Sequence, residues 1–277
     1  MSKRKFGLHL RIQTTLVDLI RRATDLGVDF FQCFLTLKTA GRVLPLNTSD
    51  IKEFVDLRRK LFNDMYLHLS YWVNLSSVEY NPHILFQKEL SLAKRLEFTH
   101  IIFHPGSSKV VGKKIEGIDS LARVLNKVIK SEPEFKFVVE NVAQGPPSIG
   151  GKLNDFKILL EKVDQPDKLC FCIDTGHAYA YGYDLSDVDY HDKFLDLVQE
   201  TIGLKRVILF HVNDTLERLG SKIDKHQKIG EGNIGQDVLK KFVLNPRIIN
   251  VPLLSEPPVM SEKELKIEFD KILSWHK

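Results

Sequence analysis

Cysteine is scarce in this sequence: Cys33, Cys170 and Cys172 are the only three in 277 residues. An odd number argues against a disulfide framework, and Cys170 and Cys172 are too close together in an apolar run to favour a mutual disulfide. Chains with few cysteines and no disulfide pattern are typical of reducing compartments. We therefore expect an intracellular protein of the cytoplasm or nucleus.

Long hydrophobic runs are also missing. No stretch approaches the roughly 18 apolar residues that a membrane helix requires. The basic start Met1–Lys5 is not followed by the apolar core of about 7–15 residues found in secretory signals. The segment Thr14–Arg22 could imitate a transit peptide, but it continues directly from a strand-like segment, so we interpret it as the first helix. The sequence predicts a protein that is not secreted and has no membrane partner.

Extreme charge and composition are absent too. The hydrophobic fraction is 43%, the charged fraction 27% and the formal net charge +4, all ordinary for a globular protein. The small positive charge agrees with a polyanionic partner but is also common in proteins that never bind nucleic acid. No linker or low-complexity stretch divides the chain, and about 250 residues is typical of one α/β barrel. We expect residues 1–277 to form a single domain.

What the sequence does contain is an alternation of short apolar runs with longer helical patterns. Such alternation predicts parallel strands joined by crossover helices. Eight such units favour a closed (β/α)8 TIM barrel over an open sheet. The eight strand-like runs are Lys5–Leu10, Val28–Cys33, Met65–His68, Thr99–His104, Phe135–Glu140, Leu169–Asp174, Arg206–His211 and Asn250–Glu256.

The helical segments carry their own signals. Apolar residues at helical spacing predict one stripe facing the barrel, for example Leu121, Val124, Leu125, Val128 and Ile129. Asp50 with Glu53 resembles a capping box that opens the second helix. Gly27 lies where the first helix should end. The longest insertion without this pattern is Asp214–Gly235.

Polar residues stand at the end of every predicted strand: His9, Gln32, His68, His104, Glu140, Asp174, His211 and Glu256. The last six are good metal ligands, separated by 36, 36, 34, 37 and 45 positions. They therefore recur with the strand–helix unit, which predicts one ring at the carboxyl-terminal mouth of the barrel. Any one of them alone is more often a capping or core residue, but six in register indicate a metal site.

Mixed imidazole and carboxylate ligands favour zinc, with manganese and iron as competitors. Three further candidates lie just beyond strand ends: His177, Asp224 and His226. Nine ligands exceed what one or two zinc ions need, because catalytic sites usually use three protein ligands and keep one open position. The natural count is three zinc ions, although His177 alone could equally be an ordinary loop histidine.

With this residue set the chain resembles the endonuclease IV family of apurinic/apyrimidinic (AP) endonucleases. The resemblance spans nearly the whole chain, and its most specific part is Asp224–Gly232. The matching segments are His68–Leu75, Phe103–Gly106, Val139–Asn141, Gln144–Gly145, Cys172–Ala178, Phe210–Asp214 and Leu219–Gly232.

The resemblance implies three zinc sites. The first uses His68, His104 and Glu140. The second uses Glu140, Asp174, His211 and Glu256, so Glu140 bridges the two. The third uses His177, Asp224 and His226. On this basis Glu256 and Glu140 are the expected catalytic residues.

Departures from the family pattern fall where DNA should be held. His9 is followed by Leu10–Gln13 in place of a glycine-containing turn. Lys225 replaces the usual arginine, a point charge for a bidentate fork. The segment Leu37–Arg42 matches the family poorly. The candidate DNA contacts are His9, Gln32, Tyr71 and Lys225, each with an ordinary alternative as a core or surface polar residue.

The resemblance implies hydrolysis of the phosphodiester 5′ to an abasic site in double-stranded DNA, leaving a 3′-hydroxyl and a 5′-deoxyribose phosphate, and removal of 3′-blocking groups. We hypothesise that a hydroxide between the first two zinc ions, oriented by Glu256, attacks phosphorus while the third stabilises the departing 3′ oxygen. We expect a monomer that needs no protein partner. Two alternatives stay open: a sugar isomerase or epimerase on the same barrel, and a non-catalytic binder of damaged DNA.

Overall fold

The computed structural model describes residues 4–37, 42–78 and 83–276. Its strands close into a barrel in the order β1-β10-β9-β8-β7-β6-β5-β2, and every neighbouring pair is parallel. The bounds are β1 Phe6–His9, β2 Phe30–Cys33, β5 Tyr66–His68, β6 His100–Phe103, β7 Lys136–Glu140, β8 Leu169–Asp174, β9 Val207–His211 and β10 Leu253–Ser255. The eight predicted strands and the TIM barrel are confirmed.

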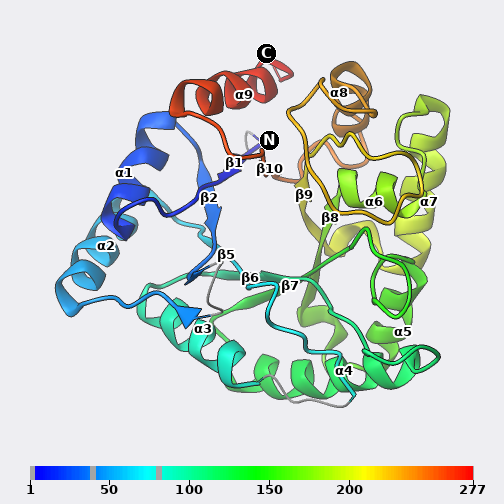
Figure 1. Ribbon diagram of the computed structural model, residues 1–277, viewed down its shortest axis with the longest axis horizontal. Helices are drawn as coiled ribbons and strands as arrows, with labels where there is room; N and C mark the ends of the chain where they lie inside the picture. Colours follow the sequence, from blue (N-terminus) through cyan, green and yellow to red (C-terminus); the bar gives the residue numbers. More distant parts are fainter. Residues whose placement is uncertain (1–3, 38–41, 79–82, 277) are drawn as a thin grey trace.

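Helices surround this barrel on the outside (Figure 1). Their bounds are α1 Leu16–Leu26, α2 Thr48–Leu61, α3 His83–Arg95, α4 Lys114–Ser131, α5 Asn154–Lys162, α6 Thr175–Tyr181, α7 His191–Thr201, α8 Gln236–Val243 and α9 Glu262–Ser274. The apolar stripe predicted around Leu121–Ile129 is buried on α4. Within the described ranges, no helix combines the length and the apolar character that crossing a membrane requires.

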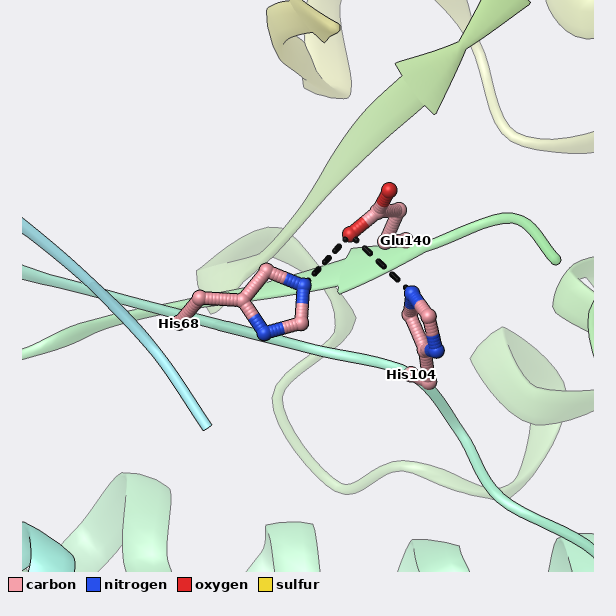
Figure 2. A group of neighbouring side chains, drawn as sticks. All are labelled: His68, His104 and Glu140. Atoms are coloured by element: carbon pink, nitrogen blue, oxygen red, sulfur yellow. Dashed lines mark hydrogen bonds and ion pairs between the residues drawn. The ribbon is translucent and has the colours of Figure 1, made fainter. Parts of the chain in front are cut away.

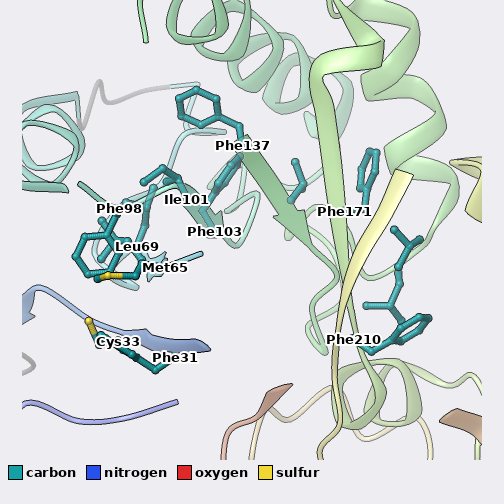
Figure 3. Packing of buried hydrophobic residues seen from close by; sticks show 14 of the residues in the cluster. Phe31, Cys33, Met65, Leu69, Phe98, Ile101, Phe103, Phe137, Phe171 and Phe210 are labelled. Carbon is teal, nitrogen blue, oxygen red and sulfur yellow. The ribbon is translucent and has the colours of Figure 1, made fainter. Parts of the chain in front are cut away.

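The barrel has two apolar layers because alternate strand residues face opposite sides. The outer layer packs between strands and helices and is rich in aromatic rings, among them Phe31, Phe103 and Phe171 (Figure 3). The inner layer fills the barrel and consists of Phe30, Tyr66, Ile102, Val138, Cys172, Leu209 and Leu254.

The strand β1 contributes a glycine to the inner layer. A Cβ on Gly7 would lie 2.5 Å from the ring of Phe30, closer than real carbon atoms approach. The missing side chain of Gly7 therefore makes room for the Phe30 ring inside the barrel.

Two local features differ from expectation. The side chain of Asn47, rather than Asp50, caps α2 by accepting from the Asp50 backbone N–H at 2.8 Å. The expected Asp50/Glu53 capping box is therefore wrong, because the helix starts one short turn earlier. An antiparallel pair, β3 Thr36–Leu37 and β4 Arg42–Val43, was not predicted. Gly27 does end α1, in the left-handed region at φ 76°.

A buried carboxylate links this small pair to the barrel mouth. Glu89 on α3 is completely buried, accepts the hydroxyl of Thr36, and accepts the backbone N–H of Ser70 at 3.3 Å. Burial raises the pKa of Glu89 to about 7. The folded protein therefore prefers the neutral carboxyl, whereas the unfolded chain ionises it at about pH 4.3.

Glu89→Gln should therefore stabilise the protein at neutral pH. The ionisation penalty in the wild type is absent below about pH 4.3, grows as the pH rises to about 7, and is constant above. The free energy of unfolding of the variant should exceed that of the wild type by up to about 3 kcal/mol at pH 8 and converge with it near pH 4. Urea unfolding of chelator-treated proteins at several pH values measures this difference, with exposed Glu161→Gln on α5 as control. A difference that does not change with pH would contradict the explanation.

Candidate metal centre

A ring of polar side chains forms the layer directly above the inner apolar layer. Each inner residue is followed two positions later on the same strand, or just beyond its end, by a polar residue facing the same way. This layer consists of His9, Gln32, His68, His104, Glu140, Asp174, His211 and Glu256. Because the strands are parallel, the structure brings all eight together at one mouth of the barrel.

The first potential metal group is formed by His68, His104 and Glu140, whose donor atoms lie within 4.8 Å of one another. The Nε2 atom of His68 lies 3.0 Å from Glu140 Oε2, and Nε2 of His104 lies 3.5 Å from the same oxygen (Figure 2). Both imidazoles therefore point at one carboxylate oxygen. A cation at that point would have three protein donors.

The second group contains Glu140 again, with Asp174, His211 and Glu256. The Nδ1 atom of His211 lies 3.0 Å from Glu140 Oε1 and 3.2 Å from Glu256 Oε2. Glu140 thus turns one oxygen to the first group and the other to the second. This is the geometry that a carboxylate bridging two cations requires.

The third group differs in detail from the expected one. The donors that come together are Asp174, His177 and His226, whereas the expectation was His177, Asp224 and His226. Asp224 is nevertheless close, with Oδ1 at 3.1 Å from His177 Nε2 and 3.9 Å from His226 Nε2. Asp174 therefore belongs to both the second and the third group. The segment that carries Asp224 and His226 completes the third group.

The electrostatics of the ring call for cations. Burial acts to raise the pKa of Glu140, but the imidazoles of His211 and His104 hold it well below its usual value. Burial acts to lower the pKa of His177, but Asp174 and Asp224 hold it well above its usual value. Without a metal, protons on imidazoles balance the carboxylates, and a divalent cation would replace them.

The hydrogen bonding and the donor types of the ring also fit a bound metal ion. The Nε2 atom of His104 is buried and makes no hydrogen bond within the described residues, because its nearest carboxylate oxygen, Glu140 Oε2, is 3.5 Å away. A buried donor or acceptor without a partner is expensive, and ligation would satisfy it. The mixed nitrogen and oxygen donors suit zinc better than magnesium.

The expected DNA contacts divide into two pairs. Gln32 and His9 are 0% and 4% exposed, so both are buried members of the ring, like the potential metal ligands beside them. Tyr71 is 65% exposed, with its ring 5.3 Å from that of His104. Lys225 is exposed between Asp224 and His226. Residues 38–41 of the poorly matching segment lie outside the described residues.

Two asparagines that were not predicted as site residues hold the backbones of Asp174 and Glu256 in place. Asn141 accepts the backbone N–H of Asp174 at 2.6 Å and donates to its carbonyl at 3.1 Å. Asn213 accepts the backbone N–H of Glu256 at 2.8 Å and donates to Asp174 Oδ2 at 2.5 Å. Their position one or two residues after a ligand was the available signal.

Asp214 organises the long segment that carries Asp224 and His226. It is completely buried, and its carboxylate accepts five backbone N–H groups. The donors are Thr215 at 2.9 Å, Gly230 at 3.0 Å, Gly232 at 3.2 Å, Ile234 at 3.0 Å and Gly235 at 3.2 Å. A Cβ on Gly232 would collide with Asp214 Oδ1. The glycine therefore allows the backbone to wrap around the carboxylate.

Comparison with known proteins agrees with this architecture. A family model described as xylose isomerase-like TIM barrel matches residues 20–270. A curated relative from Thermoplasma volcanium, named probable endonuclease 4, is 31% identical over 262 residues, which is 93% of this chain and 90% of the relative. Crystalline endonuclease IV from Thermus thermophilus is 26% identical, with TM-score 0.82 over 98% of both chains.

The barrel itself is shared more widely. A crystal structure of a D-tagatose 3-epimerase-like protein has TM-score 0.71 at 20% identity, covering 98% of this chain and 96% of that one. At that identity the likeness concerns the fold alone. The family match and the 31% identical relative are more specific: this chain belongs to the endonuclease IV family, on a xylose isomerase-like TIM barrel.

Proposed function

We propose that this protein is a zinc-dependent AP endonuclease of DNA base excision repair, acting as one domain over residues 1–277. It would hydrolyse the phosphodiester 5′ to an abasic site, leaving a 3′-hydroxyl and a 5′-deoxyribose phosphate, and remove 3′-blocking groups. The observation that carries the proposal is Glu140, whose two oxygens face two separate donor groups while a third group adjoins through Asp174. We propose a monomer working inside the cell, in the cytoplasm or nucleus.

Three bound zinc ions would supply an activated water, neutralise phosphoryl oxygens and stabilise the departing alkoxide. The residues that would hold them are the expected nine: His68, His104, Glu140, Asp174, His177, His211, Asp224, His226 and Glu256. Asp174 would serve both the second and the third group, whereas the expected ligand sets placed it in the second group alone.

Glu256 is the residue best placed to orient the attacking water. Its backbone is held by Asn213, and its Oε1 accepts from Gln32 at 2.6 Å, so Oε2 is left facing His211. Burial acts to raise the pKa of Glu256, but His211 holds it well below its usual value, so the group stays ionised. A fixed carboxylate at the second group can accept hydrogen bonds from water near the scissile phosphorus.

Two exposed aromatic side chains suit the handling of abasic DNA. Tyr71 and Trp72 are 65% and 62% exposed and follow the ligand His68. Exposed aromatic rings beside a nucleic-acid site can stack on bases. An abasic nucleotide has no base to unstack or unpair, so moving its sugar out of the duplex takes less free energy than moving an intact nucleotide.

Lys225→Ala should weaken binding to abasic DNA and make it less dependent on salt. The exposed Lys225 beside His226 would contact one phosphate, and each such contact contributes about 0.9 to the slope of log affinity against log salt. Binding measured by fluorescence anisotropy at several salt concentrations tests this. Lys127→Ala, an exposed lysine on the outer helix α4, should leave the slope unchanged. An unaltered slope in Lys225→Ala would mean that Lys225 faces solvent.

Incision of a duplex containing one tetrahydrofuran residue tests the proposed function. This abasic analogue has no aldehyde, so a hydrolase cuts it and a Schiff-base lyase does not. We expect cutting on the 5′ side without added magnesium, and extension of the upstream fragment by a polymerase. Binding without cutting would support the damaged-DNA binder, and turnover of a ketose without either would support the epimerase.

A further inference from the structure

One amide side chain connects two ligands of the second group with a third residue of the ring. The Nε2 atom of Gln32 lies 2.6 Å from Glu256 Oε1 and 2.9 Å from His9 Nδ1. Its Oε1 lies 3.0 Å from His211 Nε2. Gln32 is completely buried, so all of its hydrogen-bonding groups are directed at neighbouring side chains of the ring.

The chemistry of these partners determines which way the amide points. An ionised carboxylate only accepts hydrogen bonds, so the NH2 end of Gln32 must face Glu256. The carbonyl oxygen then faces His211 Nε2. Because that oxygen only accepts, the proton of a neutral His211 must sit on Nε2. The Nδ1 atom is left with its lone pair directed toward Glu140 and Glu256, 3.0 and 3.2 Å away.

We propose that Gln32 is a positioning residue for the second metal: it sets the tautomer of His211 and the orientation of Glu256 at the same time. We propose this role in place of the expected DNA contact because the amide of Gln32, 0% exposed, is taken up by contacts within the ring. The inference rests on the proposed function insofar as His211 and Glu256 are taken as metal ligands. Residues that orient ligands in this way typically change metal affinity or activity by about 10- to 100-fold when replaced.

His9 supports the same arrangement from the other side. Its Nδ1 lies 2.9 Å from Gln32 Nε2 and 3.2 Å from Glu256 Oε1, and its ring packs against Phe34 at 4.6 Å between centroids. The four side chains come from β1, β2, β9 and the residue after β10, which are neighbours around the barrel. Gln32 therefore spans the place where the barrel closes.

Gln32→Met is the variant that tests the inference. Methionine keeps the length and approximate shape of glutamine but has neither the donor nor the acceptor. The affinity for one zinc ion per chain, measured by competition with a chelator, should fall about 10- to 100-fold. The absorption spectrum of the cobalt-substituted protein should change as well. The metal-free variant should still fold, with a melting temperature lowered by the loss of the hydrogen bonds to Glu256, His9 and His211, and its thermal unfolding measures that loss separately from the change in zinc affinity.

Two further variants complete the design. Gln199→Met on α7 removes a glutamine that caps the Leu204 backbone N–H at 3.1 Å, away from the ring, and should leave zinc retention and the cobalt spectrum unchanged. Gln32→Asn keeps a neutral amide that is too short to reach both partners. It should also lose zinc more readily, and it carries the test if the methionine variant does not fold.

The outcomes separate this inference from the function on which it rests. Unchanged zinc retention and an unchanged cobalt spectrum in both Gln32 variants would overturn the positioning role. Loss of DNA affinity with normal metal retention would return Gln32 to the DNA interface and also overturn it. If wild type cuts abasic DNA and holds zinc while these results are obtained, only the inference fails. If wild type holds no zinc, the proposed function fails first.

Discussion

The Glu256→Gln protein should bind abasic DNA as wild type does and cut it about 100- to 10,000-fold more slowly. The amide keeps the shape of the carboxylate and can still accept from Gln32 at Oε1. It loses the negative charge and the second acceptor that we propose orients the attacking water. Single-turnover incision measured beside equilibrium binding separates the two steps.

Zinc content must be measured with the same preparation, because Glu256 is also a proposed ligand. Glu140, Asp174 and His211 remain in the second group, so we expect the ion to be retained. Glu200→Gln, an exposed carboxylate on α7, is the matched control and should cut normally. Near-normal cutting by Glu256→Gln would show that Glu256 has no catalytic role. Slow cutting by a protein that has lost one zinc ion would show that Glu256 acts as a metal ligand only.

Asp214→Ala should both destabilise the protein and empty the third metal group. The substitution leaves five backbone N–H groups without their acceptor in a buried turn. Hydrogen bonds to a charged acceptor contribute about 1.5–3 kcal/mol each when they cannot be replaced, and water can replace some of them here. We expect a loss of at least about 3 kcal/mol in the free energy of unfolding, and the loss of one of the three zinc ions that we propose for each chain.

The double variant Asp224→Ala/His226→Ala separates the structural role of Asp214 from the metal-binding role proposed for Asp224 and His226. Asp224 and His226 are only partly buried and face the metal group, so their removal should release one zinc with little loss of stability in the metal-free protein. Calorimetry of the metal-free proteins and metal analysis of the loaded ones provide the two readings. An Asp214→Ala protein that keeps three zinc ions and melts like wild type would contradict the anchoring role.

The sequence could predict the barrel and the ring because both depend on local periodicity. Inner apolar residues and ring residues occupy alternate positions of one strand, as in Val138 and Glu140 or Leu209 and His211. A polar residue after such a run is visible without knowing which strands are neighbours. Placement of all eight at one mouth then follows from parallel strands.

The partners of each ring residue could not be predicted in the same way. Gln32 lies at a strand end as the proposed ligands do, and only the closed barrel shows that its amide lies within hydrogen-bond distance of His211 and Glu256. The third group is similar, because Asp174 reaches His226 across a segment with no periodic pattern. The Asn47 cap was missed for a simpler reason: Asp50 also suits a helix start, and sequence alone does not say which residue precedes the first turn.

The closure of the barrel has a consequence for the time course of protein synthesis. The strand β10 pairs with β1 and follows every other barrel strand in chain order, and Glu256 comes directly after it. A ribosome therefore releases the other ring residues before Glu256, and an unfinished chain has neither a closed barrel nor a complete second group. The proposed cutting activity should therefore arise only when β10, the last barrel strand in chain order, has paired with β1.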